Sequence, residues 1–573
     1  MMANEPTLRD VLDHDPKPLR FGTSGVRAKV EELTDIEVYC LTRGTLEYFA
    51  ETGKLACEPK RPEQVAIPLA GDLRPSTERL LKTTARAITD AGYGVDYCGL
   101  IPTPALTYYA LQKGVASFII TGSHIPADRN GQKANRCDGE VLKSDEQGIV
   151  AAVEKLRSQE YSRPASASPF GPDGMFKEAL VPPLPKVNPA AEECYRRRYQ
   201  QVFAGESLKG WRVLFFQYSA VGRDLIPQIL ASTGADVQCA GRSDQFIPLD
   251  TEAISDSHLE MLRDLVTRQD HRMDVVLSTD GDSDRPLVVA VDGSELHFLP
   301  GDLLGALVAD YLHADAVAVP ISANPILEEF LERHGISILR TRIGSPYVIE
   351  AMHRLLDQGY RRVMAWEANG GFLLGSNISL GEHVIQALPT RDSVLPILCV
   401  LAAARERGLS VAEMLELFPP CYGRSDLIDE FPQELGKRIV GFFLPRDPEV
   451  KELRFESDGM VLLDSEGHEI KRFEWDSDIG REWKRKLDLL GQVFAVDNGF
   501  TRVSRINVLD GVRCYFANGE IAHIRPSGNA PQLRIYAFAD MRDRAKEIAE
   551  MAVREPDGLL RRLASFVEAE LGA

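Results

Sequence analysis

The chain has 573 residues, 44% of them hydrophobic, and a formal net charge of −19 at pH 7. A length of this order predicts about four domains of roughly 150 residues each. The negative charge and the lack of a basic tract argue against broad binding to nucleic acid or to acidic membranes, although a small anionic ligand needs only a local basic pocket.

The N-terminal segment lacks the basic and then apolar pattern of a signal peptide. The longest apolar stretch, around residues 394–404, is too short to span a bilayer. We therefore expect a soluble, cytoplasmic protein. The nine cysteines are scattered without a C-x-x-C pair, so the sequence indicates neither a zinc site nor a disulfide framework, and buried reduced thiols are expected.

The first predicted elements alternate strands with helical segments, which is typical of a layered α/β domain. The motif FGTSGVR, residues 21–27, contains two glycines that allow a turn to approach a ligand closely. A strand at residues 64–70 ends in the turn GDLRPS, whose Arg74 we interpret as a structural residue that braces a neighbouring loop.

A further apolar run, residues 115–120, predicts a strand that delivers Ser123 to an exposed loop, TGSHIPADRNGQK, residues 121–133. A serine hydroxyl needs a neighbouring base or metal to act as a nucleophile, and cations to hold an anionic reactant. His124 is a candidate base and Lys133 a candidate cation. On these residues alone, the alternative is a polar loop whose serine caps the next turn.

Residues 157–188 are rich in Ser, Ala and Pro, which predicts a linker or a long surface excursion. Strands at residues 211–216 and 274–278 then predict a second α/β domain with a mostly parallel sheet. Helices are expected at residues 325–334 and 393–407 further along the chain. The charged stretch around residues 436–491 is interpreted as a solvated insertion, rich in hairpins.

The second of those strands runs into STDGDSDRPLVV, which places Asp280, Asp282 and Asp284 at alternate positions. Three such carboxylates can converge on one hard cation, and a divalent ion next to a serine suits phosphoryl transfer. The alternatives are a solvated acidic turn and a calcium loop. An EF-hand requires glutamate at its twelfth position, where this chain has Val291.

Near the C-terminus, RPSGNAPQLR, residues 525–534, follows a predicted strand at residues 521–524. This turn offers backbone N–H groups, a hydroxyl, an amide and guanidinium groups to phosphate oxygens. The alternative is a surface β-turn.

Four motifs in this order, FGTSGVR, TGSHIPADRNGQK, STDGDSDRPLVV and RPSGNAPQLR, resemble those of the α-D-phosphohexomutase superfamily, the phosphomannomutases and phosphoglucomutases. The resemblance spans nearly the whole chain. It implies an α/β fold of four domains, in which three related α/β domains with mixed sheets precede a C-terminal α+β phosphate-binding domain. The boundaries we expect are 1–185, 186–296, 297–418 and 419–573, with the insertion near 436–491.

The resemblance also implies a phosphoserine at Ser123 and a Mg²⁺ ion held by Ser123, Asp280, Asp282 and Asp284. His124, Lys133 and Arg27 are then candidates for proton handling or charge stabilisation. The remaining expected site residues bind substrate (Arg285, Gly344, Ser345, Glu367 and Asn369) or phosphate (Arg525, Ser527, Gly528, Asn529 and Arg534).

The sugar-binding loop departs from the family's usual Gly-Glu-x-Ser-Gly-His. Glu367 is kept, whereas Asn369 replaces the serine and Gly371 the histidine. Glutamate and asparagine can still bond sugar hydroxyls, but a histidine able to act as acid or base is absent. Pro346 stands where many members have Lys or Arg, and Asn529-Ala530 where the family usually has Thr-Glu.

We therefore expect interconversion of hexose 6-phosphate and hexose 1-phosphate through a hexose 1,6-bisphosphate, which is both intermediate and activator, without a nucleic-acid or membrane partner. The EANGGF form of the sugar loop favours mannose phosphate; a phosphoglucomutase is the alternative, and glucosamine phosphate is less favoured. The changed loops motivate a second hypothesis, a catalytically weak sugar-phosphate-binding protein. A metal-dependent phosphatase, which would release inorganic phosphate, is a third.

Overall fold

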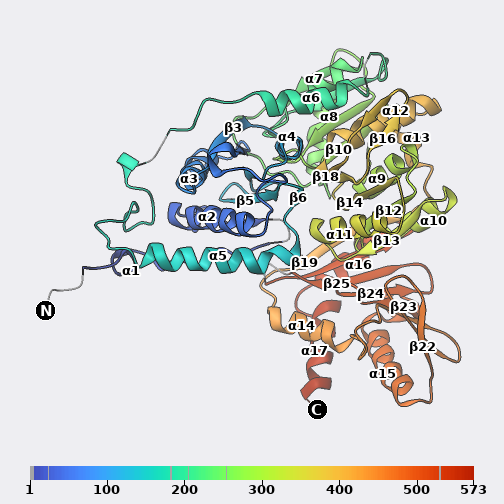
Figure 1. Ribbon diagram of the computed structural model, residues 1–573. Coiled ribbons are helices and arrows are strands. Elements are labelled where there is room, and N and C mark those ends of the chain that lie inside the picture. Colours follow the sequence, from blue (N-terminus) through green and yellow to red (C-terminus); the bar gives the residue numbers. More distant parts are fainter. Residues whose placement is uncertain are drawn as a thin grey trace. The chain divides into compact units, whose positions relative to one another are not determined.

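The computed structural model describes residues 5–22, 25–180, 183–203, 205–252, 254–527 and 531–572. It divides into two compact units, one of residues 1–317 with 344–415 and one of 318–343 with 416–573. Helices and mixed sheets alternate through the first unit (Figure 1), which confirms the expected α/β class. Among the described residues, no helix has both the length and the apolar character needed to cross a membrane.

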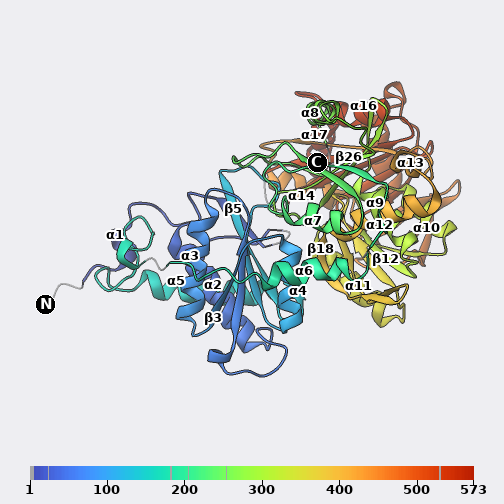
Figure 2. The ribbon, with the colours of Figure 1, turned by 90° about the horizontal axis from the view of Figure 1, so that it is seen from above.

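The first sheet has the order β1-β5-β4-β2-β3, with β6 paired to β5. Strand β2 is parallel to β3 and β4, whereas β5 is antiparallel to β1 and β4. Figure 2 shows α2, α3 and α5 on one face and α4 on the other. The bounds are β1 (Val26–Lys29), β2 (Ala66–Gly71), β3 (Gly94–Leu100), β4 (Ser117–Ile120), β5 (Arg129–Arg136), β6 (Gly139–Glu140), α2 (Asp35–Glu51), α3 (Thr77–Asp90), α4 (Thr103–Lys113) and α5 (Lys143–Tyr161).

The predicted surface excursion follows α5 and is held by aromatic packing. Phe170 and Phe176 are buried with ring centroids 4.6 Å apart, and Tyr39 of α2 meets both rings edge-on. The N-terminal α1 (Leu8–Val11) packs on α5, and η2 (Glu178–Leu180) follows the aromatic pair. These contacts explain how a segment rich in Ser and Pro stays ordered over its described residues.

The second sheet has the order β11-β10-β9-β7-β8, with β7 parallel to β8 and β9, and with β9, β10 and β11 antiparallel in succession. The expectation of a mostly parallel sheet is wrong. The aspartate loop, residues 280–285, is a tight turn that returns the chain beside β9, and a turn this short permits only antiparallel pairing. The bounds are β7 (Arg212–Phe216), β8 (Asp236–Ala240), β9 (Val275–Thr279), β10 (Pro286–Asp292), β11 (Glu295–Phe298), α6 (Ala190–Gln200), α7 (Leu225–Ser232) and α8 (Asp256–Thr267).

The remainder of the first unit contains an antiparallel run, β14-β15-β18, and the hairpin β16-β17. The predicted sugar-binding loop, residues 367–371, joins β14 to β15. The helix predicted at residues 393–407 is confirmed as α12. The bounds are α9 (Gly301–Tyr311), α11 (Ser345–Asp357), β14 (Val363–Trp366), β15 (Phe372–Leu374), β16 (Ile378–Leu380), β17 (His383–Ile385), β18 (Leu388–Asp392), α12 (Val394–Arg407) and α13 (Val411–Leu415).

The large sheet of the second unit has the order β19-β26-β25-β24-β23-β20-β21-β22, in which the neighbouring strands are antiparallel, while β12 and β13 belong to a separate sheet. The second unit also contains α10, which confirms the helix predicted at residues 325–334. The bounds are β12 (Ala316–Pro320), α10 (Ile326–Arg333), β13 (Ser337–Thr341), β19 (Tyr422–Ile428), α14 (Gln433–Phe442), β20 (Glu452–Phe455), β21 (Gly459–Leu463), β22 (Glu469–Glu474), α15 (Asp478–Val493), β23 (Val503–Asn507), β24 (Val512–Phe516), β25 (Ile521–Pro526), β26 (Leu533–Ala539), α16 (Arg542–Val553) and α17 (Leu559–Gly572).

The interpretation of residues 436–491 as solvated is wrong, whereas the expected hairpins are present. Strands β20, β21 and β22 continue the main sheet as consecutive hairpins, and β20 pairs with β23. Phe455, Met460, Trp483 and Leu490 are buried in the same core as the rest of the unit. Most of the charged residues are exposed, although Glu452 and Lys486 are buried, so the composition conceals the apolar residues that face the core.

Candidate active site

Ser123 lies directly after β4 in a left-handed backbone conformation, with φ of 57°. Its Oγ donates to Asp280 Oδ2 at 2.6 Å, and its N–H donates to Thr121 Oγ1 at 2.8 Å. The side of the loop at residues 126–129 is exposed, but Ser123 itself is only 1% exposed. The expectation that the serine lies in an exposed loop is therefore wrong for the serine, because the aspartate loop covers it.

Arg74 is the residue that holds the serine loop in place. Its guanidinium donates to the carbonyl oxygens of Ser123 (2.9 Å), Ile125 (2.5 Å), Pro126 (2.6 Å) and Arg129 (2.8 Å). Its Nε also donates to Asp72 at 3.2 Å. These bonds confirm the predicted bracing role, and they leave the hydroxyl of the serine to contact other groups.

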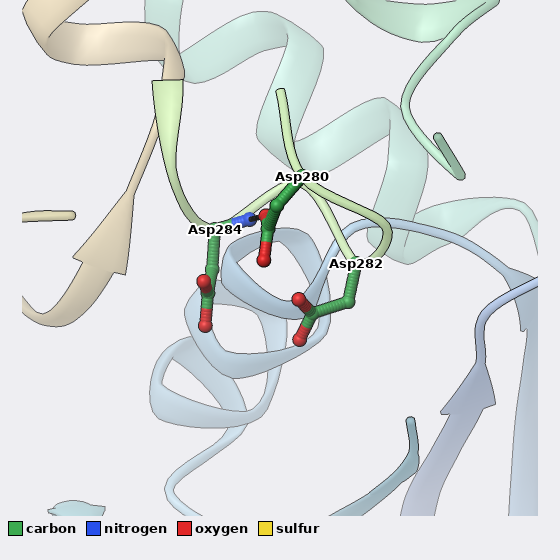
Figure 3. Close-up of side chains that lie close together, drawn as sticks. All are labelled: Asp280, Asp282 and Asp284. Atoms are coloured by element: carbon green, nitrogen blue, oxygen red, sulfur yellow. Dashed lines mark hydrogen bonds between the residues drawn. The ribbon is translucent and has the colours of Figure 1, made fainter. Parts of the chain in front are cut away.

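Asp280, Asp282 and Asp284 project from the turn between β9 and β10 toward one point (Figure 3). One oxygen from each carboxylate lies within 4.8 Å of the others, and all three residues are buried. Asp280 Oδ1 accepts the N–H groups of Asp284 and Arg285, both at 3.1 Å, which fixes the turn. Position 281 requires glycine, because a Cβ there would lie 2.5 Å from the Ser123 carbonyl oxygen.

Lys133, on β5, places a cation between two of these carboxylates. Its Nζ lies 2.7 Å from Asp282 Oδ2 and 2.9 Å from Asp284 Oδ2. In the described part of the chain, Asp282 Oδ1 and Asp284 Oδ1 are buried without a hydrogen-bond partner. A hard divalent cation takes oxygen ligands of this kind. The donor set therefore fits Mg²⁺.

The three carboxylates differ in acidity because their neighbours differ. Burial, together with Asp282 and Asp284, raises the pKa of Asp280. Burial also opposes ionisation of Asp282, but Lys133 and the hydroxyl of Thr103 at 2.6 Å outweigh it and lower the pKa of that carboxyl. For Asp284 the corresponding cation that lowers the pKa against burial is Arg391.

His124 and Arg27 both lie in this buried, positively charged region. The Nδ1 atom of His124 is 3.4 Å from Ser123 Oγ. Burial and the cations Arg285 and Arg27 lower the pKa of His124, so the ring is neutral at pH 7 and is a weaker base than an exposed histidine. Burial and Arg285 also lower the pKa of Arg27 to about 10, which leaves it charged at pH 7.

The predicted sugar residues lie on two loops of the first unit. Arg391 Nη1 donates to Glu367 Oε2 at 2.9 Å. The Asn369 amide is used within its own loop, since its Oδ1 accepts the Gly371 N–H at 3.0 Å. At the start of α11, Gly344 has φ of 131°, and Ser345 Oγ donates to Glu140 Oε2 at 2.9 Å.

Two of the predicted phosphate residues, Arg525 on β25 and Arg534 on β26, are direct cross-strand partners in the second unit. Arg525 Nε donates to Asp510 Oδ1 at 3.0 Å, and Ser527 N–H donates to the Gln532 carbonyl at 2.9 Å. Like charges directly opposite each other on a sheet are unfavourable, and here Asp510 offsets the charge of Arg525. Gly528 and Asn529 lie outside the described residues.

Family models of phosphoglucomutase/phosphomannomutase match three stretches: α/β/α domain I at residues 18–160, α/β/α domain III at 300–421 and the C-terminal domain at 482–555. A phosphomannomutase of Sinorhizobium fredii is 35% identical over 530 residues, which covers 92% of this chain and 97% of the relative. The chain belongs to the phosphoglucomutase/phosphomannomutase family.

A second relative agrees with this assignment, and a solved structure shares the fold. A phosphomannomutase of Salmonella muenchen is 32% identical over 536 residues, covering 93% of this chain and 94% of the relative. The solved structure of a phosphoglucomutase/phosphomannomutase family protein from Burkholderia thailandensis has 15% identity and a TM-score of 0.61, covering 95% of this chain and 97% of its own. The Burkholderia thailandensis protein has the same fold as this chain.

Sequence reasoning about this family member missed Arg391 and Thr103. Arg391 contacts Asp284 as well as Glu367, and Thr103, at the start of α4, donates its hydroxyl to Asp282. Neither belongs to the four motifs. A charged residue at the end of β18, just before the apolar α12, was the one signal for Arg391, since a buried charge requires partners.

Proposed function

We propose that the protein is a phosphohexomutase that interconverts hexose 6-phosphate and hexose 1-phosphate, with mannose phosphate as the leading substrate. The observation that carries this proposal is the hydrogen bond of 2.6 Å from the buried Ser123 hydroxyl to Asp280, at the edge of the three-aspartate cluster. The two relatives above that are named phosphomannomutase support mannose over glucose. A phosphoglucomutase is the alternative.

In the proposed cycle, Ser123 begins as a phosphoserine. A free hydroxyl of the substrate attacks the phosphorus, the bond from phosphorus to Ser123 Oγ breaks, and a hexose 1,6-bisphosphate forms. The hydroxyl proton passes to a nearby base and the released Ser123 Oγ takes up a proton; His124, Lys133 and Arg27 are the candidates for this proton handling. The bisphosphate then reverses its orientation and returns its other phosphate to Ser123, which leaves the isomeric product.

Charge neutralisation is the main demand of phosphoryl transfer. Mg²⁺ held by Asp280, Asp282 and Asp284 would neutralise charge on the transferring phosphoryl group. Lys133 and Arg285 add fixed positive charge at the same turn, since Arg285 Nε lies 3.7 Å from Asp284 Oδ1.

The substrate itself has to be held in two orientations. We assign recognition of its sugar hydroxyls to the loops of Glu367, Asn369, Gly344 and Ser345. We assign its non-reacting phosphate to Arg525, Ser527, Gly528, Asn529 and Arg534. Because the substrates are intracellular sugar phosphates, the proposal includes a cytoplasmic location.

The test is ³¹P NMR of the purified protein with mannose 1-phosphate or glucose 1-phosphate, Mg²⁺ and a trace of the matching 1,6-bisphosphate. We expect the 6-phosphate signal to appear, faster from mannose, and to be absent with Ser123→Ala or after chelation of the metal. Release of inorganic phosphate in place of isomer would identify a phosphatase. Binding without turnover of either sugar would identify a sugar-phosphate-binding protein and reject the mutase.

A further inference from the structure

The Arg391 side chain joins the predicted sugar-binding loop, residues 367–371, to the aspartate loop, residues 280–285, in the first unit. Its Nε and Nη2 lie 3.1 and 3.0 Å from Asp284 Oδ2, and its Nη1 lies 2.9 Å from Glu367 Oε2. Arg391 is 3% exposed. One buried guanidinium therefore neutralises a carboxylate of each loop, and its planar geometry relates their positions to each other.

This path for the arginine exists because residue 371 is glycine. A Cβ on Gly371 would lie 2.6 Å from Arg391 Cδ, 2.8 Å from its Cγ and 3.1 Å from its Cβ. Any side chain at position 371, including the histidine of the usual family pattern, would exclude the present position of the arginine. Gly371 and Arg391 thus form a matched pair.

The backbone around Arg391 is held on both sides. Thr390 Oγ1 donates to Glu140 at 2.6 Å, and Asp392 accepts the hydroxyl of Tyr195 at 2.5 Å. Ser393 Oγ donates to the carbonyl of Ser283, within the aspartate loop, at 2.8 Å. The end of β18 is therefore a rigid support rather than a mobile loop, and the guanidinium it carries is fixed in place.

We propose that Arg391 is a positioning residue for sugar recognition: it holds the Glu367 carboxylate in the orientation that accepts sugar hydroxyls, and it ties that orientation to the metal-binding loop through Asp284. The inference rests on the proposed function, since it assigns hydroxyl recognition to Glu367. It extends that function by naming the residue that orients the recognising group.

The test measures binding without turnover, by titration calorimetry of mannose 1-phosphate into Mg²⁺-containing Ser123→Ala protein. In that background we compare Arg391→Met, Arg391→Lys, Glu367→Gln and the double variant Arg391→Met/Glu367→Gln. Loss of a hydrogen bond to a charged group predicts about tenfold weaker binding for Arg391→Met. Because Arg391 acts through Glu367, the double variant should bind no more weakly than Glu367→Gln alone. Arg391→Lys should restore part of the affinity.

The matched control is Arg157→Met. Arg157 is also a buried arginine that bridges two carboxylates, Glu37 at 2.8 Å and Glu154 at 3.1 Å, but it lies between α2 and α5. The Arg157→Met substitution should lower the melting temperature about as much as Arg391→Met does, and it should leave sugar-phosphate binding unchanged.

Additive effects of Arg391→Met and Glu367→Gln, or unchanged affinity in the folded Arg391→Met protein, would overturn the positioning role. Isomerisation by the parent protein with Ser123 intact is measured separately by ³¹P NMR. If that activity is present, a failed prediction in the binding comparison of the variants rejects only the role of Arg391. If activity and binding are both absent, the proposed function fails and this inference fails with it.

Discussion

Ser123 and Asp280 are joined by a hydrogen bond of 2.6 Å between the serine Oγ and the aspartate Oδ2, although β4 and β9, the strands that precede them, belong to different sheets. The proposed nucleophile and a proposed metal ligand are thus brought together before any substrate binds. Such preassembly reduces the reorganisation that the chemical step requires.

Asp280→Asn should therefore weaken metal binding and abolish isomerase activity together. Loss of one carboxylate charge from an all-oxygen site lowers affinity for a hard cation. We expect the dissociation constant for Mn²⁺, used as a probe for Mg²⁺, to rise at least about tenfold. Electron paramagnetic resonance measures it. The control is Asp292→Asn, an exposed aspartate at the far end of β10. Equal Mn²⁺ affinity in the two variants would contradict the assignment.

Arg74→Met should destabilise the protein by about 3–5 kcal/mol, because it leaves Asp72 buried without its cation and removes the donors from the serine-loop carbonyl oxygens. The measurement is urea unfolding, compared with Arg86→Met. Arg86 pairs with Asp90 at a partly exposed position of α3, where an ion pair contributes less than about 1 kcal/mol. Similar losses in the two variants would show that Arg74 does not hold the loop.

His523 should make the protein less stable in acid. It is buried, its Nε2–H donates to the Asp510 carbonyl at 2.6 Å, and burial and Arg513 lower its pKa from 6.5 to about 3. Between these values the unfolded chain binds a proton that the folded chain does not, so this contribution to stability is complete above pH 6.5 and is lost as the pH falls.

The free energy of unfolding, measured at about pH 7.5 and about pH 5.5, should therefore decrease by about 1 kcal/mol more in the wild type than in His523→Gln. The comparison uses the difference between the two pH values, so a uniform loss of stability in the variant does not affect it. An identical decrease in both proteins would mean that His523 titrates normally when folded.

Phosphate should stabilise the second unit through Arg525 and Arg534. An anion that binds only the folded state raises the melting temperature, and here it would also relieve repulsion between cross-strand cations. We expect inorganic phosphate to raise the melting temperature of the wild type more than chloride at equal ionic strength does, and this excess to disappear in Arg534→Met. The same excess in the variant would place the anion elsewhere.

The sequence predicted the aspartate cluster and the serine loop well because their chemistry is local: three alternate carboxylates on one turn point the same way. It did not predict the burial of Ser123, which depends on Asp280 arriving from another sheet, nor Arg391, whose partners Asp284 and Glu367 are distant in the chain. Contacts of this kind arise only when the chain folds. The burial of residues within 436–491 was missed for a different reason. The many exposed charged residues of this stretch obscured the apolar residues, such as Phe455 and Met460, that face the core.

Strand β22 is the last strand of the eight-stranded sheet, and Glu469, Lys471, Arg472 and Glu474 on it are all exposed. An unpaired strand edge is a template for association with other chains, and alternating charges on that edge oppose such association. Without residues 436–491, the outermost strand would instead be β23, which carries the core residue Ile506. The outward charges of β22 therefore protect this edge against association, and a variant in which Lys471 and Arg472 are replaced by neutral residues should precipitate at concentrations at which the wild type stays dispersed.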